Sequence, residues 1–250
     1  MTELDRILRF KEDHIRSQAD DVQEHLFGFA VRNRRYAASH HHNKVVITGP
    51  ADAQEILALA DHALGGSAHR LVEIHHEPTA RAVTGALTEA GYDHECNLLM
   101  LHQGAPPPPA PGVVTVTLAD LHEPVRASWA AELPHLSPEE LDQLTERRAT
   151  LLQDGYETTF LAVKDAGASI VCHGDLYIHR PSGMAQFEDL STHPDHRRRG
   201  HARAVVTEAI HRAGELTLFL EADGADWPKD FYGRLGFTPV GRTHHFRRML

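Results

Sequence analysis

Residues 187–202 constrain the fold of this chain more than any other segment, because an apolar run there leads through a basic turn into a helical pattern. Pro194 lacks a backbone N–H, so the strand expected from the apolar run ends before it. After Gly200, apolar residues recur on one helical face at Ala202, Val205, Val206, Ala209 and Ile210. The sequence therefore predicts a strand, a turn and a helix in succession.

The turn is strongly basic, with Arg197, Arg198 and Arg199 followed by Gly200. The first N–H groups of a helix have no partner within it, and the helix dipole places positive charge there. Guanidinium groups bind phosphate oxygens in pairs, and glycine lets a ligand approach the backbone closely. A charge run alone is usually a solvated face, but in this setting it predicts a phosphate-binding turn.

The same residues resemble the acetyl-coenzyme A motif of the GNAT N-acetyltransferase superfamily, Val-x-Pro-x-x-Arg/Gln-x-x-Gly-x-Gly/Ala. Its diagnostic positions hold Pro194, Arg197, Gly200 and Ala202, and Thr192 replaces the usual valine. Residues 232–237 are similar to a second family signature, Tyr-x-x-x-Gly-Phe. Two motifs in the family's order are a specific signal, and they imply an α/β fold with a mixed central sheet flanked by helices.

The resemblance covers residues 113–250, and the patterns along this segment follow the family's order of elements. Strands are expected at 113–117, 160–164, 169–174, 187–192, 216–221 and 242–248, and helices at 121–130, from Ser137, from Gly200 and at 228–235. Ser137, with Pro138 and acidic residues behind it, is a typical helix start. We expect 113–250 to be the catalytic GNAT acetyltransferase domain.

Residues 105–112 are rich in proline and predict a stiff linker. Ahead of it, strand and helix patterns at 45–64 and 70–92 repeat part of the order of the second half, but no arginine stands in the first turn. We interpret residues 1–104 as a smaller, degenerate GNAT-like α/β half, as in tandem members of the family. An unrelated α/β cap is the alternative.

The resemblance implies acetyl-CoA as cosubstrate and assigns residues to its parts. Backbone groups of Leu190, Ser191 and Thr192 would hold the pantetheine arm at a splayed strand. The residues expected at the phosphates are Arg197, Arg198, Arg199, Gly200, His201 and Ala202. Asp226 stands near the place where relatives often carry an asparagine that contacts the pantetheine.

Transfer to an amine needs a base, donors at the oxyanion and an acid for the leaving thiolate. Tyr232 occupies the family's position for that acid, and packing against the core is its alternative role. As base we favour Glu188, which two-residue alternation places with Leu190, and then Glu221. Asp189 ranks last because alternation points it to the opposite face.

Composition supports these assignments by exclusion. The formal net charge of −10 argues against a general nucleic-acid binder. No apolar stretch approaches the roughly 20 residues of a membrane span, and a cytoplasmic protein is expected. Cys96 and Cys172 are expected to be buried free thiols. The histidines at 40–42 and 75–76 are expected on surface loops, so no metal site is predicted.

The sequence thus predicts an N-acetyltransferase that moves an acetyl group from acetyl-CoA to a primary amine, without a covalent enzyme intermediate. The acceptor is open between a small molecule and a peptide or protein amine. The first half would lend a wall to the acceptor pocket or a surface for assembly, for example as a homodimer. The alternative function is a non-catalytic acyl-CoA-binding regulatory or scaffold protein.

Overall fold

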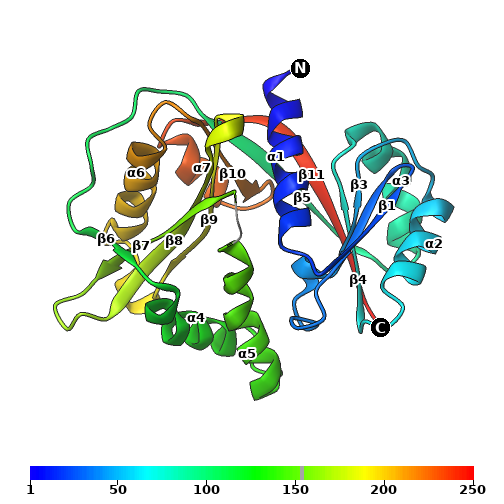
Figure 1. Ribbon diagram of the computed structural model, residues 1–250, viewed down its shortest axis with the longest axis horizontal. Helices are drawn as coiled ribbons and strands as arrows, with labels where there is room; N and C mark the ends of the chain where they lie inside the picture. Colours follow the sequence, from blue (N-terminus) through cyan, green and yellow to red (C-terminus); the bar gives the residue numbers. More distant parts are fainter. Residues whose placement is uncertain (153–154) are drawn as a thin grey trace. The chain divides into compact units, whose positions relative to one another are not determined.

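The computed structural model describes residues 1–152 and 155–250, which form two compact units (Figure 1). Unit 1 comprises residues 1–99, 222–229 and 239–250, and unit 2 comprises residues 100–221 and 230–238. These units differ from the two segments expected on either side of the linker, because the carboxyl-terminal strand groups with unit 1. Strands pair through space, so a segment distant in sequence completes the first sheet.

Unit 1 is a mixed sheet with helices on both faces. Its strands lie in the order β1, β2, β3, β4, β11, with β3 and β4 parallel and the other neighbours antiparallel. The elements that belong to it in whole or in part are α1 (Glu3–Ser17), β1 (Asp21–His25), β2 (Gly28–Arg32), β3 (Lys44–Ile47), α2 (Ala53–Ala63), β4 (His69–Ile74), α3 (Glu77–Glu89), β5 (Asp93–His102) and β11 (Phe237–Met249). The strands and helices expected within 45–92 are present, whereas α1, β1 and β2 were not expected.

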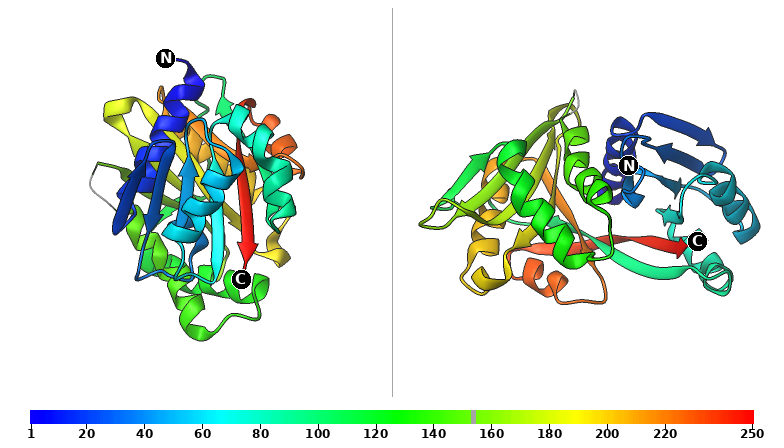
Figure 2. Two further views of the ribbon diagram at one scale, coloured as in Figure 1. Left: turned by 90° about the vertical axis from the view of Figure 1, so that its right-hand side faces the viewer. Right: turned by 90° about the horizontal axis from the view of Figure 1, so that it is seen from below.

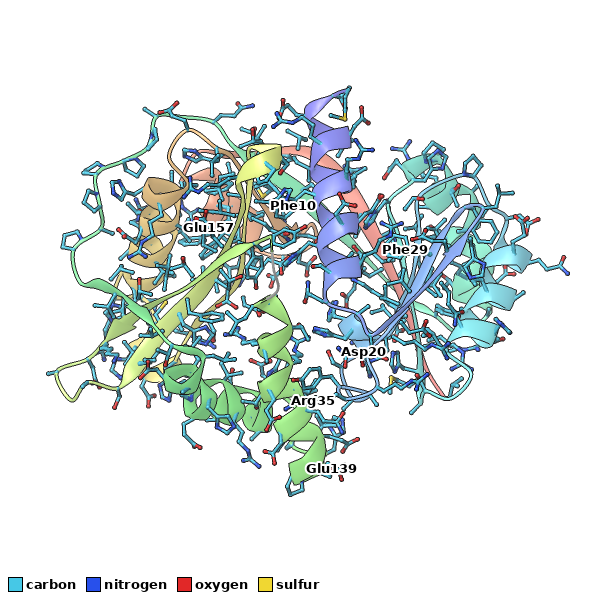
Figure 3. All side chains as sticks on the ribbon, in the orientation of Figure 1. Phe10, Asp20, Phe29, Arg35, Glu139 and Glu157 are labelled. Atoms are coloured by element: carbon cyan, nitrogen blue, oxygen red, sulfur yellow. The ribbon has the colours of Figure 1, made fainter. Side chains whose placement is uncertain are left out.

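Alternating residues of the strands of unit 1 serve two cores. Val45, Ile47 and Ala30 face a core shared with α2 and α3. Phe29 and Val46 face α1, where the Arg16 guanidinium lies 3.6 Å from the centre of the Phe29 ring. Figure 3 shows Phe29 on β2 beside α1. The period of two along each strand therefore buries both faces of this sheet.

A buried ionic cluster lies in unit 1 around Glu73 of β4. Its carboxylate contacts Lys44 at 2.5 Å, Lys11 at 3.4 Å and the Nε2 of His75 at 2.8 Å. The nearby cations hold the pKa of Glu73 well below its usual value against the opposing effect of burial. The expectation that His75 lies on a surface loop is wrong, because this ion-paired network draws its ring into the interior, where the residue is 4% exposed.

The strands of unit 2 lie in the order β10, β9, β8, β7, β6. Only β9 and β10 are parallel, and α6 packs on one face while α4 with α5 lies on the other (Figure 2). Its elements are β6 (Val113–Val116), α4 (Leu118–Glu132), α5 (Pro138–Glu146), the 3-10 helix η2 (Arg147–Leu151), β7 (Glu157–Lys164), β8 (Ile170–His179), β9 (Met184–Thr192), α6 (His201–Ala213), β10 (Thr217–Asp223) and α7 (Pro228–Gly233).

Local sequence explains the helix boundaries of unit 2. As predicted, Ser137 caps α5, and its hydroxyl accepts a hydrogen bond from the N–H of Glu140. The Glu140 carboxylate in turn accepts a hydrogen bond from the N–H of Ser137. Thr117 and Asp120 form the same arrangement at α4. The expected strand and helix patterns from 113 to 250 are confirmed, with boundaries shifted by a few residues.

The proline-rich segment is held against α6. The N–H of Ala110 donates to Glu208 at 2.9 Å, and the carbonyl of Pro107 lies 3.0 Å from the Nδ1 of His211. This segment is therefore tied to unit 2 along much of its length. Within the described ranges, no helix combines the length and apolar character needed to cross a membrane.

Candidate functional site

Strand β9 parts from β10 at the point where the expected cofactor residues begin. The parallel register of the two strands runs from Met184 opposite Thr217 to Phe187 opposite Leu220. Strand β9 continues through Thr192 and stays paired with β8 on its other side. Across the described chain, the β9–β10 register therefore ends before Glu188, which leaves a splay between the two strands.

A bulge interrupts β9 directly after this point. Asp175 of β8 is opposite Glu188, and His173 is opposite Ser191, so Asp189 and Leu190 together face Gly174. The backbone of Asp189 takes a left-handed conformation, with φ of 54°. A Cβ on Gly174 would lie 2.6 Å from the Phe187 ring, so only glycine fits there.

The bulge corrects one expectation. Two-residue alternation was expected to direct Asp189 away from the site that Leu190 serves. Because the bulge adds a residue, Asp189, Leu190 and Ser191 instead line one pocket. The alternation argument for Glu188 and Leu190 fails at the same place, since the bulge lies between them.

The basic turn leads into α6 as predicted. Gly200 is the N-cap residue, with φ of 85° and no side-chain capping bond, and a Cβ built on it would meet open space. The first helical residues are His201 and Ala202. Arg198 also has a left-handed backbone, with φ of 62°.

The arginine side chains of the turn are exposed. Arg197 donates from Nε to the carbonyl of Thr192 at 3.2 Å, and Arg199 donates to the carbonyl of Asp195 at 2.9 Å. These bonds fold the turn back onto the end of β9. The turn thus combines an uncapped helix start with three cations, which is the arrangement that binds anions.

Tyr232 lies on α7 and is buried, with 9% of its surface exposed. Its ring packs edge-on against Phe237 with centres 6.0 Å apart. Burial, with smaller contributions from the charges of Cys172 and Glu188, raises the pKa of Tyr232 to about 12. Its phenol therefore keeps its proton at neutral pH and lies within electrostatic reach of the splayed strand.

The two carboxylates favoured as base, Glu188 and Glu221, lie on neighbouring strands and are both half-buried. Glu188, half-buried on β9, accepts a hydrogen bond from the side chain of Gln186. Glu221 lies on β10 and is half-buried as well. Asp226 groups with unit 1 and is exposed, and its carboxylate accepts a bond from the N–H of Trp227 at 2.7 Å. The expected contact of Asp226 with pantetheine stays a prediction.

Cys172 borders the site as a free thiol on β8. It accepts a hydrogen bond from the Thr192 hydroxyl at 3.2 Å, and burial raises its pKa to about 11. The protonated thiol is a poor nucleophile. Cys96 is likewise free but only half-buried. Both cysteines are free thiols as expected, although only Cys172 is fully buried.

A pocket of about 190 Å³ adjoins the bulge in unit 2. Helix α4 contributes Val125, Ser128, Trp129 and Glu132, and the remaining walls are Arg148, His173, Asp189, Leu190 and Ser191. The Arg147 guanidinium lies 5.3 Å from the centre of the Trp129 ring. The pocket brings an aromatic wall and charged groups to the strand expected to hold the thioester.

Sequence reasoning missed the buried charges beneath this pocket. Arg148, whose side chain is 7% exposed, contacts Asp189 at 2.9 Å and the fully buried Asp175 at 3.4 Å. Burial raises the pKa of Asp175 to about 8, while the charge of Arg148 outweighs desolvation at Asp189 and lowers its pKa to about 2. Burial and the charge of Arg148 lower the pKa of His173 to about 4. An aspartate within a mainly apolar strand at 170–178, two residues after His173, is the signal that pointed to Asp175.

Residues 155–239 match the family model for the acetyltransferase (GNAT) domain, a range that contains the splay, the bulge and the basic turn. Over this segment the chain resembles a GNAT acetyltransferase domain. No curated protein matches the sequence.

Solved structures show the same fold at low sequence identity. A conserved protein of unknown function from Staphylococcus epidermidis has a TM-score of 0.70 at 13% identity, with 92% of this chain and 94% of that chain covered. A GCN5-related N-acetyltransferase from Kribbella flavida has a TM-score of 0.62 at 16% identity, with 99% and 96% covered. A tandem GNAT protein from the clavulanic acid biosynthesis pathway has a TM-score of 0.55 at 14% identity, with 82% and 73% covered.

Proposed function

We propose that this protein transfers the acetyl group of acetyl-CoA to a primary amine. The observation that carries the proposal is the continuity of three features along one segment. Strand β9 splays from β10 after Phe187, it bulges at Asp189, and it ends in a basic turn whose helix α6 starts without a side-chain cap. Together these supply unpaired backbone groups beside an anion-binding helix end.

The residues present fit the phosphates of coenzyme A. Open space around Gly200 leaves room for a ligand at the first turn of α6, and the Arg198 and Arg199 guanidiniums border that turn. We assign the phosphates to the N–H groups of Gly200, His201 and Ala202 together with the three arginines. Leu190, Ser191 and Thr192 are assigned to the pantetheine arm and the thioester.

The reaction forms a C–N bond at the acetyl carbon and breaks its C–S bond. The attacking nitrogen loses one proton and the departing sulfur gains one. We assign Glu188 as the base, with Glu221 as the second choice, and Tyr232 as the acid. A phenol with a pKa of about 12 is protonated at neutral pH and is therefore available to donate.

The first half of the chain supports the proposal of a degenerate GNAT-like repeat. Its order β3, α2, β4, α3, β5, with β3 parallel to β4, repeats the order β9, α6, β10, α7, β11, with β9 parallel to β10. The helix starts differ. Asp52 caps α2 with its own carboxylate, whereas Gly200 leaves the start of α6 open. The carboxylate on α2 disfavours an anion, so we propose that only the second half binds acetyl-CoA.

Calorimetry with acetyl-CoA, followed by mass spectrometry of acetylated products from a panel of primary amines, tests the proposed function. The panel spans phenethylamine, putrescine and a lysine-containing peptide. Binding with transfer to an amine supports the enzyme. Binding without transfer to any amine contradicts it and favours the non-catalytic acyl-CoA-binding protein, and absence of binding contradicts both.

A further inference from the structure

Arg148 bridges the two strands that form the bulge. It extends from η2, and its guanidinium contacts Asp175 on β8 at 3.4 Å and Asp189 on β9 at 2.9 Å. Asp175 is opposite Glu188, immediately before the bulge, and Asp189 is the first bulged residue. One cation therefore holds both strands at the point where their register changes.

The conformation of Asp189 needs such support. A left-handed backbone is uncommon for any residue other than glycine, although aspartate tolerates it better than most. The ion pair is shielded from water on one side only, with the Arg148 side chain 7% exposed and that of Asp189 37% exposed. An ion pair shielded in this way is held more firmly than one on the surface.

The charges of the bridge balance at neutral pH. Burial raises the pKa of Asp175 to about 8, so this carboxyl is protonated at neutral pH. The carboxylate of Asp189, with a pKa of about 2, is ionised and is the counterion of Arg148. Asp175 then serves as a neutral hydrogen-bonding partner, which also accepts from the Tyr177 hydroxyl at 3.3 Å.

We propose that the Arg148–Asp189 ion pair is a positioning device for acetyl transfer, which fixes the bulge and so aims the backbone of Leu190 and Ser191 at the thioester. The inference rests on the proposed function. Because Arg148 and Asp189 also line the pocket beside Trp129, the same pair would set the acceptor wall against the thioester strand. Small errors in such geometry are costly, with a 1 Å misplacement reducing turnover by about 100-fold.

Substitutions of Asp189 separate its negative charge, its hydrogen bond with Arg148 and its tolerance of the left-handed backbone. Asp189→Asn keeps tolerance of the left-handed backbone and can still accept a bond from Arg148. Asp189→Gly keeps the backbone freedom alone, and Asp189→Ala loses both. A positioning role predicts kcat within about 3-fold of wild type for Asn, a larger loss for Gly and a loss of about 10- to 100-fold for Ala.

The measurements are kcat and KM on the panel amine that the wild-type protein acetylates, the acetyl-CoA Kd from calorimetry, and the thermal midpoint. Arg148→Lys should retain more activity than Arg148→Met, because the ammonium can still pair with Asp189. Gly112→Ala is the control for backbone strain, since Gly112 has φ of 80° and open space at its Cβ outside the pocket residues. It should lower the thermal midpoint and leave kcat unchanged.

Other outcomes overturn the proposal in distinguishable ways. Equal losses for Asn, Gly and Ala would show that the carboxylate charge acts on the substrate directly. Lower thermal midpoints with unchanged kcat and Kd would show a purely structural pair. If the wild-type protein neither binds acetyl-CoA nor acetylates an amine, the proposed function fails first and this inference fails with it.

Discussion

At the scale of the residue, the packing of Tyr232 and its proposed role as an acid both depend on its burial. Its ring is buried against Phe237, which fixes the phenol, and the same burial raises its pKa to about 12. The two roles weighed from the sequence, acid and core residue, are therefore compatible. Substitution can separate them, because phenylalanine keeps the ring and removes the hydroxyl.

Tyr232→Phe should leave the acetyl-CoA Kd within about 2-fold of wild type and lower kcat by about 10- to 100-fold, the usual range for losing an acid. Calorimetry and steady-state kinetics measure the two quantities. Phe231→Leu on the same helix is the matched control and should change neither by more than a few-fold. An unchanged kcat for Tyr232→Phe would remove Tyr232 from the mechanism.

Gly200 is required for its backbone. Its φ of 85° suits glycine, and no protein atom lies within 4 Å of the position a Cβ would take. A side chain there would point into space that we assign to the phosphates.

Gly200→Glu should weaken acetyl-CoA binding by at least about 100-fold, because it adds strain and places an anion at an anion site. Gly85→Glu is the charge-matched control, since Gly85 lies in α3 with nothing near its Cβ and no positive φ. It should bind normally. Calorimetry that finds equal affinity in both variants would contradict the assignment of the phosphates to this turn.

At the scale of elements, the sequence predicted what local patterns encode. The strand, basic turn and helix at 187–213 follow from Pro194, Gly200 and helical periodicity, and all three are present. A bulge in the splayed strand is what the family resemblance implied, but local patterns could not place it at Asp189, because the partner of that residue, Arg148, lies more than 40 residues away along the chain. Strand β1 was missed because its polar residues give a weak signal, and β2 because its apolar run, from Phe29 to Val31, is short.

The buried acid of β8 should make stability depend on pH. The folded state holds the Asp175 proton up to a pKa of about 8, whereas an unfolded aspartate releases it near its ordinary value of about 4. This contribution is complete below about pH 4 and is lost as the pH rises to 8. Asp189, with a pKa of about 2, is charged throughout that window.

Asp175→Asn should therefore flatten the pH dependence of stability. The free energy of unfolding of wild type relative to the variant should fall by roughly 1–4 kcal/mol between pH 5 and pH 8. Urea unfolding at the two pH values measures it. A difference that stays constant, or that grows with pH, would show that Asp175 is ionised in the folded protein.

At the scale of the whole molecule, the chain does not divide at its proline-rich segment. Residues 239–250 supply β11 to unit 1, where Phe246 is opposite Val72 of β4 and its ring stacks on His94 at 4.5 Å. Phe246 is fully buried in the core shared with α2 and α3. The first half therefore depends on the last strand of the chain.

Two experiments follow from that dependence. Phe246→Ala should lower the free energy of unfolding by about 3–5 kcal/mol, whereas Met249→Ala on the same strand, at a side chain 59% exposed, should change it by less than about 0.5 kcal/mol. A fragment of residues 1–104 lacks β11, one of the two partners of β4, so its circular dichroism should show no cooperative thermal transition. Without β11, one edge of β4 would expose a row of backbone donors and acceptors beside an open core. A fragment that nevertheless unfolds cooperatively would mean that residues 1–104 are a domain in their own right.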